Sequence, residues 1–99
     1  MRYWISYDLG LQGEYDQLYA WLDGNGAKEC GDSVATFQSK LSREEVVKEL
    51  SRVLNPKRNA RIYIITMKNG GKFVFGKRKV APWTGYAQAL EPGVEEADE

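Results

Sequence analysis

The chain of 99 residues has the length of one domain, and its 42% apolar and 28% charged residues are typical of a soluble globular protein. It has no histidine and one cysteine, which excludes Ser-His-Asp and Cys-His catalysis, histidine metal ligation and an intramolecular disulfide. No apolar run approaches the roughly 20 residues of a membrane span, and no signal peptide precedes the first predicted strand. We therefore expect a cytoplasmic protein with no membrane contact.

The formal net charge is zero, but the charges are segregated along the chain. Residues 1–49 hold five basic and nine acidic residues, residues 50–90 hold nine basic and no acidic residues, and residues 91–99 hold five acidic and no basic residues. The basic stretch predicts a polyanion partner, with the alternative of a solvated sheet edge that lysines protect against strand pairing. The tail of residues 91–99 has nothing to pack and is predicted to be disordered.

The first half of the chain predicts a strand, a helix and two further strands. Tyr3, Ile5 and Tyr7 alternate with Trp4, Ser6 and Asp8 over residues 2–8, as a strand requires. A helix is predicted from about residue 13 to residue 25, with an apolar stripe formed by Tyr15, Leu18, Tyr19 and Leu22. Two strands follow at about 27–31 and 33–39, joined by a tight turn at Gly31-Asp32.

The second half predicts a helix, a strand and a returning hairpin. Ser42 and Glu45 have the spacing of a capping box, so a second helix starts there, and Asn55-Pro56 ends it. The buried stripe of this helix is predicted to be Val46, Val47, Leu50, Val53 and Leu54. Residues 60–67 are rich in β-branched and aromatic residues, and "NGG" at 69–71 indicates that residues 72–76 pair back onto them.

The order β-α-β-β-α-β predicts an α+β, ferredoxin-like fold, in which two helices cover one face of a four-stranded antiparallel sheet. Residues 1–90 form this domain, and the hairpin after residue 67 is a C-terminal extension. Tyr3 and Trp4 are adjacent in the first strand, so they point to opposite faces of the sheet. An apolar side chain on the uncovered face predicts a partner there, and a second copy of the chain is the simplest partner.

The basic stretch also carries aromatic residues. Tyr63, Phe73 and Phe75 interleave with basic residues, which is typical of a stacking and charge surface for nucleic acid; the alternative is that these rings belong to the core. The candidate nucleic-acid-binding residues are Arg61, Lys68, Lys72, Lys77, Arg78 and Lys79. The glycine- and lysine-containing segment at 69–77 lacks the spacing of a phosphate loop, and we expect no organic cofactor.

Asp8 ends the first strand, just before Gly10. The order of elements and a few residues resemble the small CRISPR adaptation proteins of the "Cas two" type, and in layout also the VapD-type toxins. The resemblance covers about residues 2–67. It depends on Tyr7-Asp8 at the end of the first strand, "GA" at 26–27, Ser33-Val34 and Phe37 in the third strand, the capped helix, and "RIYII" at 61–65.

The resemblance implies a homodimer formed through the uncovered sheet face, in which the Asp8 carboxylates of two subunits hold Mg²⁺ or Mn²⁺. Such a site would make Asp8 the metal-binding and catalytic residue of an endonuclease, because a metal-bound water can attack a phosphodiester without histidine. The dimer interface would include Trp4, Tyr7 and Phe37. The segment "GEYDQ" at 13–17 departs from the family, whose members carry arginines there.

Two hypotheses therefore follow from the sequence. The first is a dimeric nucleic-acid-binding protein, either a metal-dependent endonuclease or a relative that has lost catalysis. The second is a non-catalytic protein–protein interaction module that uses the uncovered sheet face, in which Asp8 only binds backbone N–H groups of the Gly10 turn.

Overall fold

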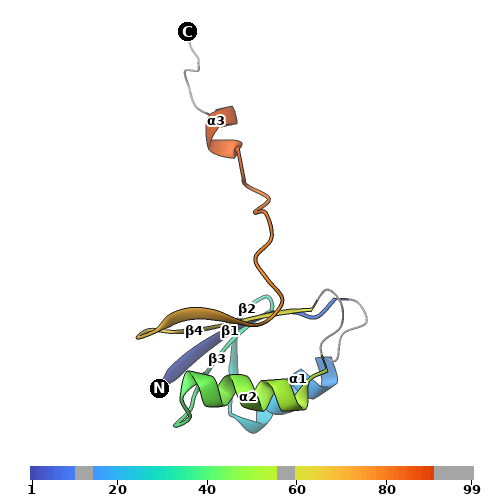
Figure 1. The fold of residues 1–99 in the computed structure, drawn as a ribbon, viewed down its shortest axis with the longest axis vertical. Helices are drawn as coiled ribbons and strands as arrows, with labels where there is room; N and C mark the ends of the chain where they lie inside the picture. The colour runs from blue at the N-terminus through green and yellow to red at the C-terminus, as the bar shows by residue number, and fades with distance from the viewer. Residues whose placement is uncertain (11–14, 56–59, 91–99) are drawn as a thin grey trace.

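The computed structural model describes residues 1–10, 15–55 and 60–90 and shows an α+β fold with a five-stranded antiparallel sheet (Figure 1). The strand order is β2-β3-β1-β4-β5, and every neighbouring pair is antiparallel. The elements are β1 (Arg2–Asp8), α1 (Tyr15–Gly24), β2 (Lys28–Gly31), β3 (Val34–Gln38), α2 (Arg43–Val53), β4 (Arg61–Thr66), β5 (Gly70–Phe75) and α3 (Tyr86–Leu90). The predicted α+β class and the predicted return of the chain onto residues 61–67 are confirmed.

The helices α1 and α2 lie side by side against one face of the sheet, and the core fills the space between (Figure 1). The odd-numbered residues of β1 point into this core, so Tyr3 and Ile5 are fully buried and Tyr7 is 9% exposed. Trp4 is half-buried on the opposite face, beside the exposed Ser6. The alternation in β1 therefore predicted correctly that Tyr3 and Trp4 lie on opposite faces of the sheet.

The alternation of side chains between the two sheet faces also shows that two residues of the predicted dimer interface, Tyr7 and Phe37, lie on the covered face. Phe37 of β3 pairs with Tyr3 of β1, so both rings lie on the helix-covered side, and Phe37 is 1% exposed. Its ring stacks on Tyr3 and meets Trp21 of α1 edge-on, each with a centroid distance of 5.2 Å. Tyr7 and Phe37 thus belong to the core of one subunit, and of the three expected interface residues Trp4 alone lies on the uncovered face.

Three of the four residues predicted for the apolar stripe of α1 pack against the core: Leu18 and Leu22 are buried and Tyr15 is partly buried. Leu18, Trp21 and Leu22 are the buried residues of this helix, whereas Tyr19 is half exposed. Trp21 was not predicted, and its indole Nε1 donates a hydrogen bond of 2.9 Å to Glu49 of α2. The apolar ring of Trp21 therefore adds to the buried side of α1, while its polar atom donates to the neighbouring helix α2.

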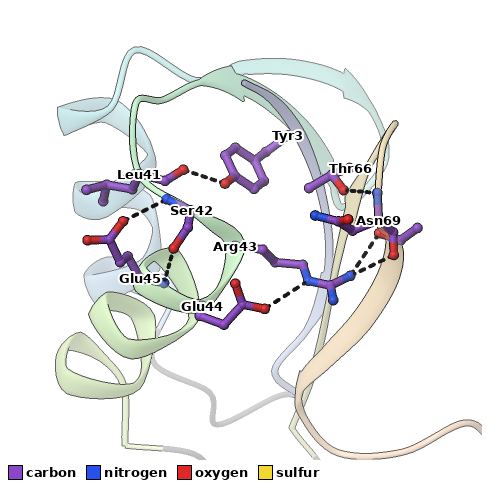
Figure 2. A network of polar contacts seen from close by, with 9 residues as sticks. Tyr3, Leu41, Ser42, Arg43, Glu44, Glu45, Thr66 and Asn69 are labelled. Carbon is purple, nitrogen blue, oxygen red and sulfur yellow. Dashed lines mark hydrogen bonds and ion pairs between the residues drawn. The ribbon is translucent and has the colours of Figure 1, made fainter.

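The start of α2 is capped as predicted. Ser42 Oγ accepts a hydrogen bond of 3.2 Å from the Glu45 backbone N–H, and Glu45 Oε1 accepts one of 2.8 Å from the Ser42 backbone N–H (Figure 2). Hydrogen bonds from Ser42 hold the pKa of Glu45 below its usual value, because they favour the carboxylate. The helix then buries Val46 and Leu50, while Val53, expected in the stripe, is exposed.

Arg43 connects α2 to the hairpin. Its Nη1 donates hydrogen bonds of 2.9 Å and 3.4 Å to the carbonyl oxygens of Asn69 and Gly70 (Figure 2). The Asn69 backbone N–H donates to Thr66 Oγ1 at 2.9 Å, which closes the turn between β4 and β5. These contacts fix the direction in which β5 leaves the turn and returns along β4.

The chain beyond β5 leaves on the side opposite α1 and α2, and α3 stands clear of the sheet (Figure 1). Two successive turns precede α3, closed by hydrogen bonds from Thr84 N–H to the Ala81 carbonyl at 3.1 Å and from Tyr86 N–H to the Trp83 carbonyl at 3.0 Å. The short helix α3 was not predicted. The tail of residues 91–99, predicted to be disordered, lies outside the described residues. Within the described ranges, no helix is both long and apolar enough to span a membrane.

Candidate functional site

A groove of about 500 Å³ lies on the uncovered side, between the sheet and the segment of residues 78–83. Its floor comes from β1, β4 and β5, and its lining includes Asp8, Arg61, Tyr63, Phe73, Arg78 and Trp83. Lys79 also lines the groove. Three basic side chains and one acidic side chain therefore surround it, a formal balance of +2.

Strand register assembles this floor. Ser6 pairs with Tyr63 between β1 and β4, and Asp8 pairs with Arg61, so these side chains share the uncovered face. Tyr63 also pairs with Phe73 of β5, across a register shift between Ile62 and Tyr63. The two rings meet with their centroids 4.7 Å apart at 60°. The bulge thus keeps Phe73 on the uncovered face, while Phe75 packs against the core opposite Ile62.

Arg78 covers the aromatic pair. Its Cζ lies 5.5 Å from the centroid of Tyr63 and 5.6 Å from that of Phe73. A guanidinium over a ring face is attracted by the ring quadrupole. Residue 78 follows β5 in an exposed segment without regular structure, so this contact joins the start of that segment to the uncovered face.

Asp8 has two local partners. Its Oδ1 accepts a hydrogen bond of 3.2 Å from the Gly10 backbone N–H, and its Oδ2 lies 3.7 Å from Arg61 Nη2. The first contact is the turn contact that the sequence left open as the alternative to a metal role. Among the described residues there is no group of three or more acidic, cysteine or histidine side chains that could hold a metal ion.

The Arg61 guanidinium has few hydrogen-bond partners among the described residues. Its only ion pair within the described ranges is the contact with Asp8, and its Nε is buried there without a hydrogen-bond partner. An exposed ion pair of this length is weak, so an incoming anion can compete for the guanidinium. The Tyr7 ring points to the core side, where it meets Tyr15 and Tyr19, and burial raises the pKa of its phenol.

The structure divides the predicted nucleic-acid-binding residues. Arg61, Arg78 and Lys79 come together in the groove. Lys68 lies in the turn between β4 and β5, and Lys72 pairs with the buried Ile64, which places it on the helix-covered side of the edge strand. Lys77 is exposed next to the groove but does not line it.

Trp83 is a groove residue that the sequence did not assign. It is 72% exposed, and it follows the basic residues 77–79 by only a few positions. No local pattern around Trp83 predicts that it lies at the groove, because that position depends on the tertiary structure. A comparison with models of protein families, with curated proteins and with solved structures finds no match to this chain.

Proposed function

We propose that this protein binds nucleic acid through the groove on the uncovered face of its sheet. The observation that carries the proposal is the guanidinium of Arg78 over the rings of Tyr63 and Phe73, in a groove that Arg61 and Lys79 also line. Aromatic faces among basic side chains bind nucleic acid by stacking bases and pairing with phosphates. A groove for an uncharged apolar ligand would not need three basic side chains in its lining.

The fold supports this use of the uncovered face. We infer a ferredoxin-like layout for β1 to β4, supported by the order β2-β3-β1-β4 and by both helices lying against one face. In this layout β5 extends the sheet beside β4 and brings Phe73 and the following basic segment to the uncovered side. The extension that the resemblance did not cover therefore supplies half of the groove.

A homodimer is the second part of the proposal. Trp4, Val34 and Ile65 are half-buried apolar residues on neighbouring strands. By register, Trp4 pairs with Ile65 and Ser6 pairs with Val34, so the three side chains share the uncovered face. A second copy that covers this patch would also give the protein–protein interaction module that the sequence left as its alternative.

A metal-dependent endonuclease activity remains a prediction. It depends on the match in position between Asp8 and the metal-binding aspartate of the small CRISPR adaptation proteins. Two Asp8 carboxylates brought together in a dimer would repel unless a cation lay between them. In this chain each carboxylate would first have to leave Arg61. The test is cleavage of single- and double-stranded RNA and DNA with and without Mg²⁺ or Mn²⁺.

Anisotropy of a labelled oligonucleotide of about 15 residues, titrated between 50 and 200 mM salt, tests binding. We expect saturable binding that weakens with salt. The triple variant Arg61→Gln, Arg78→Gln and Lys79→Gln should bind more weakly, and its salt slope should be smaller by up to about two units for a single strand. The matched control is Lys40→Gln, Lys48→Gln and Arg52→Gln, three exposed residues outside the groove.

The control variant removes the same formal charge but should keep most of the affinity. No saturable binding by the natural chain at 50 mM salt would contradict the proposed function. Equal loss of affinity in the two triple variants would show that net charge alone, and not the groove, attracts the oligonucleotide.

A further inference from the structure

The ring of Tyr63 lies across Gly71 of the neighbouring strand. A Cβ atom at residue 71 would overlap Oη, Cζ and Cε2 of Tyr63, so only glycine leaves room for the ring there. Gly71 pairs with Ile65, two residues beyond Tyr63 on β4, so the ring reaches diagonally over the backbone of β5. A ring in this position lies against the sheet instead of standing upright from it.

The ring is covered on its groove side by Arg78. A guanidinium is planar and delocalised, and it stacks on aromatic faces as a nucleobase does. Arg78 is exposed, and cation–π contacts at exposed sites are weak. One stacked base contributes about 5- to 150-fold in affinity, which is more than such a contact contributes.

We infer, on the basis of the proposed function, that the groove binds single-stranded nucleic acid and that an unpaired base replaces the Arg78 guanidinium on Tyr63 and Phe73. Arg78 then turns to a phosphate of the same strand. The bases of a duplex are stacked on each other, so their faces cannot reach rings that lie against a sheet. The volume of about 500 Å³ is within the range of small-ligand sites, which suits one flexible strand and not a double helix.

Gly71 is a positioning residue in this arrangement. It makes no contact with the strand and acts through Tyr63, because the empty space at its Cα sets the ring flat. Gly71→Ala should therefore weaken binding as the loss of the ring does. The combination with Tyr63→Leu should bind no more weakly than Tyr63→Leu alone, because leucine has no Oη or Cζ for the new methyl group to meet.

The first experiment compares a labelled single strand with a duplex of the same length and salt concentration. We expect the single strand to bind at least about 10-fold more tightly. Tyr63→Leu should reduce single-strand affinity by about 5- to 150-fold and leave duplex affinity nearly unchanged, and Tyr63→Phe should keep the affinity of the natural chain. Circular dichroism and thermal unfolding of each variant confirm that it is folded.

The outcomes separate the inference from the proposed function. If duplex and single strand bind equally and Tyr63→Leu changes neither, the single-strand site is wrong while nucleic-acid binding stands. If neither binds, both are wrong. If Gly71→Ala fails to fold, the double variant with Tyr63→Leu still reports on the site, because recovery of its folding would confirm the overlap and continued unfolding would contradict it.

A second experiment tests the displacement of Arg78. Arg78→Lys keeps the positive charge but removes the planar group that stacks on the rings. If the guanidinium must leave when a base arrives, this variant should bind the single strand at least as tightly as the natural chain and with the same salt slope. A loss of affinity of about 5-fold or more would mean that Arg78 itself stacks on the bound base, and would overturn the displacement.

Discussion

Asp8 and Arg61 face each other across β1 and β4, with Asp8 Oδ2 3.7 Å from Arg61 Nη2. The pair lies in the floor of the groove, so the carboxylate offsets one of the three basic side chains there. The same carboxylate binds the Gly10 backbone N–H. Asp8 therefore has a local structural role in the Gly10 turn and an electrostatic effect on the groove.

Replacing Asp8 with asparagine should tighten nucleic-acid binding. Asp8→Asn removes the negative charge beside Arg61, and asparagine can still accept the Gly10 hydrogen bond. The gain should fade as salt rises, because exposed charges are screened within about 10 Å at 0.1 M salt. Stability should change by less than about 1 kcal/mol, since exposed ion pairs contribute little. Anisotropy titrations and urea unfolding measure the two effects. Weaker binding, together with the loss of Mg²⁺- or Mn²⁺-dependent cleavage, would favour the metal role of Asp8 instead.

The capping box should make stability depend on pH in the acid range. The pKa of Glu45 is lowered in the folded chain from its usual 4.5, so its contribution is present above pH 4.5 and is lost as pH falls through the lower folded value. Glu45→Gln should remove this dependence while keeping the hydrogen bond to Ser42, and Ser42→Ala should cost about 1 kcal/mol at pH 7. Urea midpoints between pH 3 and pH 7 measure this. An unchanged pH dependence in Glu45→Gln would show that another carboxyl group is responsible.

Phe37 should contribute to folding of one subunit and not to assembly. Phe37→Ala removes a ring that packs against Tyr3 and Trp21, and this should cost about 3–5 kcal/mol of unfolding free energy. Trp4→Ala, on the half-buried opposite face, should cost clearly less in the monomer. Chemical unfolding at submicromolar protein concentration gives both values. A larger loss for Trp4→Ala than for Phe37→Ala would contradict the assignment of the two faces.

The proposed homodimer should sediment as a particle of about twice 11.3 kDa, or 22.6 kDa, at micromolar concentration. Trp4→Glu places a charge in the apolar patch on the uncovered face and should give a monomer. Trp83→Glu, at a 72% exposed position outside that patch, is the control and should leave the dimer intact. A natural chain that is monomeric throughout this range would exclude the dimer and, with it, a metal ion shared between two Asp8 residues.

The local features of this protein follow from its sequence alone. The capping box of Ser42 and Glu45 and the return of the chain after "NGG" each depend on residues a few positions apart, and the structure has both. The alternation in residues 2–8 likewise predicted that Tyr3 and Trp4 lie on opposite faces of the sheet. The segregation of charge needed no structure at all. These features are decided by backbone conformation and short-range hydrogen bonds, which a short stretch of sequence specifies.

The groove, in contrast, was decided by tertiary structure. Tyr63 meets Phe73 only because of the register between β4 and β5, and the bulge beside Tyr63 keeps Phe73 on the uncovered face. Arg78 reaches both rings only because the chain beyond β5 leaves on the uncovered side of the sheet. Phe37 was assigned to an interface because its sequence position does not reveal which face of β3 meets the helices. Register, strand order and the path of an irregular segment depend on contacts between distant residues, so the pattern of neighbouring residues could not determine them.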